Sequence, residues 1–190
     1  MERRALLAIA ILAILSAVPG ANAAVTVLGN TVANGCYKAA EFGGSPKDGI
    51  ETCSYAIDKE PLSIRDRAAT FINRGILRSR ATDPNGALGD YNAGLALDAS
   101  LAEGYIDRGA TYIVLQKYDV ALQDINKGID MGARKPQIAY YDRAIVNEAL
   151  GNIRGAYEDY KKAVELEPDF ALASEQPTRF KVVRKRSDGT

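Results

Sequence analysis

Apolar side chains between residues 62 and 170 recur at intervals of three and four residues, in paired stretches of about a dozen residues. This spacing places them along one face of a helix, so each pair of stretches predicts two amphipathic helices. Turn signals separate the stretches: Asp83-Pro84 offers an N-cap and a first-turn proline, Asn152 can cap a later helix, and Pro168 follows its end. A single hairpin of this kind cannot bury its own apolar faces. The pattern therefore predicts an all-α protein, an α-solenoid of stacked antiparallel helical hairpins.

A short motif occurs three times in this region, as Phe71–Gly75, Tyr105–Gly109 and Tyr140–Ala144, and the last residues of the motifs are 34 and 35 residues apart. Its leading aromatic side chains are expected to fill the gap to the neighbouring repeat. Further small residues follow each motif at constant intervals, and small side chains let two helix backbones approach closely. The positions expected to pack in this way are Gly75, Ala87, Gly94, Gly109, Ala121, Gly128, Ala144, Ala156 and Ala163.

The period, the small residues, the leading aromatic residue and the closing Pro168 resemble the tetratricopeptide repeat (TPR), in an exported protein of bacterial type. The resemblance predicts three full repeats, at residues 62–101, 102–136 and 137–170. The sequence departs from the family pattern where Ala99 replaces the closing proline of the first repeat and where this proline is displaced to Pro136 in the second.

A degenerate helical hairpin is predicted at residues 36–61, ahead of the three repeats. Within it Gly49, Ala56 and Pro61 repeat the internal spacing of the first full repeat. The step from this hairpin to the next is four residues longer than the period, which is about one extra turn in the helix that leads to Gly75.

Residues 1–23 have the order of a secretory signal peptide: a charged start, an apolar stretch and a triplet of small residues, with cleavage between Ala23 and Ala24. An uncleaved membrane anchor is the alternative, although the apolar stretch is shorter than the ~20 residues that span a bilayer. We expect an exported protein, located in the periplasm or secreted.

Cys36 and Cys53 are the only two cysteines. In an oxidising compartment they are expected to form a disulfide that staples the degenerate hairpin, worth about 3 kcal/mol on the chain-entropy argument. Two buried, unlinked thiols are the alternative.

The two ends of the mature chain carry no strong pattern. Residues 24–35 are predicted to be a flexible N-terminal segment, and residues 171–190 a short cap and a basic tail. Phe170–Gln176 is a candidate capping helix that stops at Pro177. Attachment to the cell envelope, a membrane or nucleic acid through the tail is an alternative function, although a short basic run is more often simply solvated.

Each full repeat carries an arginine followed sixteen residues later by an aspartate. This separation leads from one helix around the turn to its antiparallel partner, so we expect ion pairs within or between hairpins. The alternative is a row of arginines presented to an anionic ligand, which the accompanying aspartates disfavour. The pairs are Arg74 with Asp90, Arg108 with Asp124, and Arg143 with Asp159.

The resemblance implies a concave groove, formed by the first helices of the repeats, that holds a protein or peptide partner. Such a lining, apolar with a row of acids, would suit an apolar segment with basic flanks. Members that clamp a chaperone's terminal carboxylate use lysine, arginine and asparagine here, and only Asn73 fits that pattern. Part of this set is also expected to pack between repeats. The groove positions are Ile72, Asn73, Ile76, Ile106, Asp107, Ala110, Tyr141, Asp142 and Ile145.

Composition argues against catalysis. The chain has no histidine and no tryptophan, which removes histidine-based nucleophile systems and histidine metal sites, and its 24 basic and 24 acidic residues give no net field for nucleic acid. Asp107 and Asp142 could in principle act as a carboxylate pair on cell-wall sugar, but they recur at equivalent repeat positions, whereas an acid and a base need different environments. We therefore expect a non-catalytic binding scaffold without metal or cofactor. Dimerisation through the open terminal repeats is a further alternative.

Overall fold

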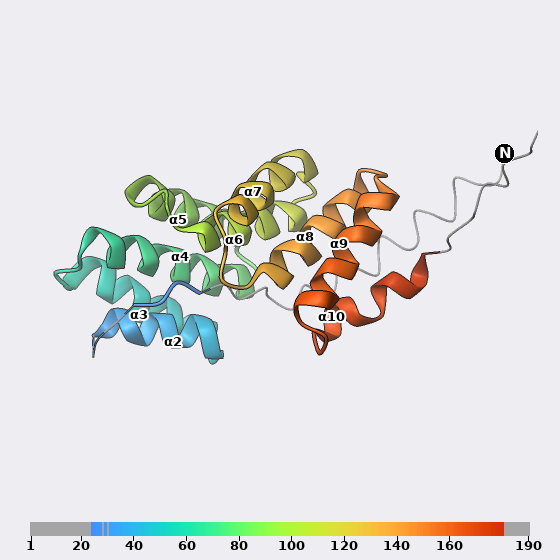
Figure 1. Cartoon of the computed structure of the whole chain (residues 1–190). Helices are drawn as coiled ribbons and strands as arrows, with labels where there is room; N and C mark the ends of the chain where they lie inside the picture. Colours follow the sequence, from blue (N-terminus) through green and yellow to red (C-terminus); the bar gives the residue numbers. More distant parts are fainter. Residues whose placement is uncertain (1–23, 28, 30, 181–190) are drawn as a thin grey trace, which may run out of the picture.

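The computed structural model describes residues 24–27, 29 and 31–180, and all of its regular structure is helical. The helices pack in sequence order as stacked antiparallel pairs, which confirms the predicted fold class (Figure 1). The predicted signal peptide at residues 1–23 and the basic tail from residue 181 lie outside the described residues. Among those described, no helix is long and apolar enough to cross a membrane.

The described residues form four hairpins, and in the last three the first helix contacts both its partner and the preceding hairpin. The α4 helix has 17 residues, against 13 in α6 and 14 in α8, so it carries the additional turn expected before Gly75. The hairpins are formed by α2 (Val32–Phe42) and α3 (Pro46–Lys59), α4 (Ile64–Arg80) and α5 (Pro84–Leu97), α6 (Ala102–Val114) and α7 (Tyr118–Asp130), and α8 (Pro136–Ala149) and α9 (Ile153–Leu166).

The turns inside the three full repeats share one backbone conformation although their residues differ. Thr82, Gln116 and Gly151 all have positive φ, at 59°, 57° and 80°. The next residue then caps the second helix in two of the three cases: Asp83 accepts a hydrogen bond from the Gly86 amide, and Asn152 accepts one from the Gly155 amide. Only Gly151 has the residue type that favours this conformation, so sequence alone signals the turn geometry once in three repeats.

Small residues set the distance between the two helices of a hairpin. A β-carbon added at Gly94 would lie 2.8 Å from Cδ1 of Ile72 and 2.9 Å from the Ala68 carbonyl oxygen. At the equivalent position, Gly128 faces Ile106 in the same way. The second helix of each of these hairpins therefore approaches the first closely enough to bury the isoleucine completely, as the small-residue pattern requires.

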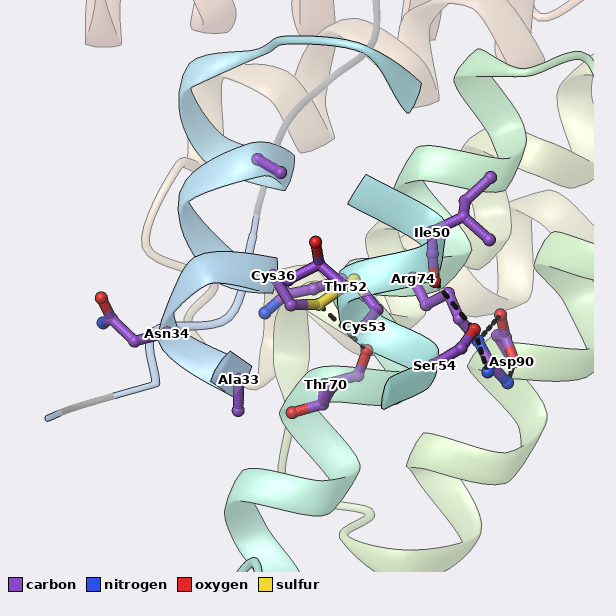
Figure 2. Close-up of a disulfide and its surroundings, with 12 residues drawn as sticks. Ala33, Asn34, Cys36, Ile50, Thr52, Cys53, Ser54, Thr70, Arg74 and Asp90 are labelled. Carbon is purple, nitrogen blue, oxygen red and sulfur yellow. Dashed lines mark hydrogen bonds and ion pairs between the residues drawn. A yellow bond between two sulfur atoms is a disulfide. The ribbon is translucent and has the colours of Figure 1, made fainter. Parts of the chain in front are cut away.

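A disulfide joins the two helices of the N-terminal hairpin (Figure 2). Cys36 of α2 and Cys53 of α3 are fully buried, and their Sγ atoms are 2.11 Å apart. The same hairpin is closed at its other end by Glu60, whose carboxylate accepts hydrogen bonds from the backbone amides of Val32 and Ala33. A carboxylate suits the first turn of a helix because the amides there have no partner within the helix.

The C-terminal cap differs from the single helix predicted at residues 170–176. One turn of α-helix, α10 (Ala171–Ser174), is followed by a 3₁₀ helix, η2 (Gln176–Arg179). Pro177 lies in the first turn of η2 and does not end it. A proline is tolerated there because its missing amide has no partner to lose. Aromatic side chains cover the end of the stack: Phe170 packs on Tyr141, and Phe180 packs on Tyr157 and Tyr160.

Candidate peptide-binding face

An arginine in the first helix of each full repeat makes two hydrogen bonds to the aspartate sixteen residues later. Nε of Arg108 donates to Oδ2 of Asp124 at 2.7 Å, and its Nη2 donates to Oδ1 at 2.8 Å. The other two pairs have the same geometry, Arg74 with Asp90 and Arg143 with Asp159. The ion pair therefore lies within a hairpin and fixes one helix against the other in a two-point contact.

The remaining guanidinium nitrogen of each arginine reaches back to the preceding hairpin. Nη1 of Arg74 donates to the Ser54 hydroxyl of α3 at 2.9 Å, as Figure 2 shows. Two asparagines accept the corresponding bonds in the later repeats: Asn92 from Arg108 at 2.7 Å, and Asn126 from Arg143 at 2.9 Å. Each arginine thus joins three helices, and the pairing with an earlier asparagine or serine was missed from sequence.

The leading aromatic residue of each motif lies beneath the same guanidinium. The arginine carbon Cζ is 5.4 Å from the ring centre of Phe71, 5.5 Å from that of Tyr105 and 5.1 Å from that of Tyr140. With an aspartate, a polar side chain and an aromatic ring around it, each arginine is fully engaged inside the stack. The hydrogen bonds to Asp124 and Asp159 also raise the pKa of Arg108 and of Arg143. This arrangement disfavours the alternative of a row of arginines awaiting an anionic ligand.

Several residues predicted to line the groove are interior instead. Ile72 and Ile106 pack against Gly94 and Gly128 inside their hairpins, and Ile76 is buried in the main core. Residues four apart lie on one face of a helix, and here that face points toward the partner helix. Three residues of the predicted set are partly exposed: Ala110, Tyr141 and Ile145, of which Tyr141 contacts the rings of Tyr160 and Phe170.

Asn73 contacts the backbone of a segment far from it in sequence. Its carboxamide oxygen accepts a hydrogen bond from the Val25 amide at 2.9 Å, and its carboxamide nitrogen donates to the Val25 carbonyl at 2.8 Å. Val25 and the neighbouring Ala24 and Val27 are buried. The structure therefore differs from the predicted flexible segment at 24–35: residues 24–27, here named the N-terminal segment, pack on α4, and α2 begins at Val32 rather than near Cys36.

The loop between α7 and α8 holds the other side of the N-terminal segment. Arg134 donates from Nη2 to the Ala24 carbonyl and from Nη1 to the Thr26 hydroxyl, and its Nε is 2.9 Å from a carboxylate oxygen of Glu103. The neighbouring Lys135 pairs with Glu41 of α2 at 2.7 Å. This loop belongs to the repeat with the additional residue, and no local sequence signal linked it to a segment 110 residues earlier.

The acidic residues at the position of Asn73 in the next two repeats, Asp107 and Asp142, are both buried. Burial raises the pKa of Asp142 to about 8. Among the described residues, Oδ2 of this carboxyl has no hydrogen-bond partner. At neutral pH most Asp142 side chains are therefore neutral, because removing the proton would leave a charge in a poorly solvated place.

Comparison with known proteins gives relatives for this arrangement, although no family model matches the chain. Serine/threonine-protein phosphatase 5 of Rattus norvegicus is 33% identical over 90 residues, 47% of this chain and 18% of the phosphatase. A DnaJ homolog subfamily C member 7 homolog of Schizosaccharomyces pombe is 29% identical over 90 residues, 47% of this chain and 19% of that protein. The chain thus spans about a fifth of the length of the curated relatives it matches.

Solved structures of repeat proteins superpose on a larger share of the chain. The first TPR of Spaghetti (RPAP3), bound to the HSP90 peptide SRMEEVD, has a TM-score of 0.55 and 25% identity, over 59% of this chain and 90% of that one. A TPR protein from Parabacteroides merdae has a TM-score of 0.60 and 22% identity, over 78% of this chain and 55% of that one. The chain therefore has a TPR-like fold, a solenoid of stacked helical hairpins. The first helices of the three full repeats, α4, α6 and α8, carry Asn73, Asp107 and Asp142. The side of these three helices on which the three residues lie is here named the TPR face.

Within the part of the chain that the structure describes, no three histidine, cysteine or acidic side chains come together as a metal site. Asp107 and Asp142, the candidate acid and base, are only 3% and 2% exposed, so a sugar chain could not reach them without rearrangement of the helices.

Replacing Arg108 by alanine is expected to lower the free energy of unfolding by about 3 kcal/mol, because Asp124 would stay buried without its partner. Arg154→Ala is the matched control: Arg154 also pairs with an acid, Glu158, but at the surface, and its loss should leave the free energy of unfolding almost unchanged. Urea unfolding followed by circular dichroism measures both. Equal, small losses in the two variants would show that the buried pair does not hold the hairpin together.

Replacing Asp142 by asparagine is expected to stabilise the protein at pH 7.5 and to have little effect at pH 4. The folded carboxyl keeps its proton up to about pH 8, whereas the unfolded one loses it near its ordinary pKa. Between these values the folded chain binds more protons, so the free energy of unfolding falls as the pH rises, by up to about 1.4 kcal/mol per pH unit. Asparagine has no such cost.

The measurement is urea unfolding at several pH values between 4 and 8.5, with the exposed Asp58→Asn of α3 as the control. The control should follow the wild-type profile. A difference between Asp142→Asn and wild type that stays constant over this range would contradict the buried, protonated carboxyl.

Proposed function

We propose that this protein is an exported, non-catalytic TPR scaffold that binds an extended segment of another protein on its TPR face. The observation that carries the proposal is the paired hydrogen bond between Asn73 and the backbone of Val25. A carboxamide that satisfies both backbone groups of one residue recognises an extended chain regardless of its side chains. The TPR face therefore already performs, on a segment of its own chain, the contact that a peptide partner needs.

The RPAP3 domain supports the same mode, since its solved structure holds a peptide. That peptide, SRMEEVD, is acidic at its C-terminal end. The TPR face of this chain instead carries two acids, Asp107 and Asp142, beside Asn73. An acidic terminal tail suits this face poorly, because neither a neutral nor an ionised carboxyl offers it a cation, so the proposed partner is an apolar segment with basic flanks.

A buried disulfide and the leader-like N-terminus together support export. Disulfides such as Cys36–Cys53 persist in oxidising compartments outside the cytosol. Cleavage is predicted between Ala23 and Ala24. Cleavage there would leave Ala24 as the first residue of the mature protein, already in contact with Arg134.

Export predicts a defined mature mass. The chain recovered from the periplasmic or secreted fraction of its own cell should begin at Ala24 and carry no titratable thiol after denaturation, because the disulfide occupies both cysteines. Intact mass spectrometry with and without reduction measures both properties. Recovery of an uncleaved chain with two free thiols from the cytosol would overturn the export proposal.

The binding face is tested by photocrosslinking in intact cells. A photoreactive amino acid is placed at Ala110 or Ile145, two partly exposed positions on first helices, and for comparison at Val120 or Ile153, two exposed positions on second helices. Adducts with other proteins are expected from the first pair and not from the second. The four variants should have equal thermal stability, which circular dichroism checks. Adducts that arise only from the second pair, or none from any position, would contradict binding on the TPR face.

A further inference from the structure

The N-terminal segment packs on α4 through its apolar side chains. Ala24, Val25 and Val27 are buried, while the side chain of Thr26 is only partly covered. The three apolar residues belong to the same core cluster as Ile72 and Ile76 of α4, so the segment covers α4 and leaves Thr26 at its outer edge.

Backbone contacts provide most of its polar interactions. Asn73 hydrogen-bonds to both the amide and the carbonyl of Val25. The side chains of Arg134 and Asn34 donate to the carbonyls of Ala24 and Val27, respectively. Only the Thr26 hydroxyl contributes a side-chain bond, to Arg134. Any extended segment with small or branched apolar side chains could make the same set of contacts.

The contacts also reach across the molecule. Asn73 belongs to the first full repeat, and Arg134 lies just before α8 of the third, so the N-terminal segment bridges the two ends of the TPR face. A partner segment that entered this face in the same extended form would need the same two side chains. Both cannot bind at once.

We propose that residues 24–27 are a built-in occupant of the TPR face, and that a partner segment binds by taking over their contacts with Asn73 and Arg134. The competition with a partner rests on the proposed function, whereas the seating of the segment does not. The partner is then an extended stretch with an apolar, polar, apolar sequence, and affinity for it is set by how firmly the chain's own segment is held.

The test titrates a fluorescent peptide with the sequence of residues 24–31 into the full chain with its native N-terminus. Val25→Asp places a charge among the buried side chains and should release the segment, whereas Val120→Asp places the same charge at an exposed position of α7 and should not. Because a tethered segment competes at an effective concentration of about millimolar, Val25→Asp should bind the peptide at least about tenfold more tightly than wild type. Val120→Asp should bind it as wild type does.

Hydrogen exchange of the Val25 amide, followed by NMR, reports on the seating independently. In wild type this amide should exchange slowly, and replacing Asn73 by alanine should remove the protection. Val27→Asp gives a second route to release, and a thermal melt verifies that each variant is folded.

Rapid exchange at Val25 in wild type would overturn the seating of the segment. A protected amide with equal peptide affinity in wild type, Val25→Asp and Val27→Asp would overturn the competition. Either result is compatible with crosslinks from Ala110 and Ile145, so it is distinguishable from failure of the proposed function. Conversely, a tenfold gain without any crosslinks would leave the seating of the segment standing and remove the scaffold role, and with it the competition with a partner.

Discussion

The two-point contact between an arginine and the aspartate sixteen residues later fixes the register on which the rest of the stack depends. Two amphipathic helices can slide past one another by a turn and still bury apolar surface, but a guanidinium fork meets a carboxylate in one alignment only. Breaking a buried pair is costly although forming it gains little net free energy, so its main contribution is to specify the alignment. The third bond, from Arg108 to Asn92 for example, carries this alignment from one hairpin to the next.

The N-terminal hairpin shows what replaces this contact when it is absent. Ser54 takes the place of Asn92, so the positions of the arginine and the aspartate hold Cys36 and Thr52 in this hairpin, which cannot form a bidentate pair. The covalent link between Cys36 and Cys53 holds α2 against α3 instead. Ser54 keeps the other half of the pattern, because it still accepts from Arg74 of the next hairpin (Figure 2). A terminal hairpin with one neighbour is thus held by a covalent bond where the full repeats use an ion pair.

The sequence predicted what repeats and could not predict what occurs once. The period placed the hairpins, and the sixteen-residue spacing identified the arginine and aspartate partners, because these features recur and compensate for weak local signals. The groove positions were assigned by family resemblance. The resemblance did not separate residues that point into a hairpin, such as Ile72, from neighbouring residues in the sequence that point away from it. The contacts of Arg134 with the N-terminal segment join residues about 110 positions apart through a loop with no motif. Nothing in a single sequence marks such a contact, since its cause is the curvature of the whole stack.

Asn73, Asp107 and Asp142 occupy the same position of the TPR face in successive repeats. Whether an aspartate here can form the same hydrogen bonds as the asparagine depends on its protonation. Asn73 binds a backbone because its carboxamide both donates and accepts. An ionised carboxylate can only accept, and would meet only the amide of an extended chain. A carboxyl whose pKa is raised to about 8, as at Asp142, keeps a proton at neutral pH and so can donate and accept as asparagine does. The third repeat thereby offers the same bonding capacity as the first, but only while its surroundings stay dry. Water admitted beside Asp142 would ionise it and turn a neutral backbone receptor into a site for a cation.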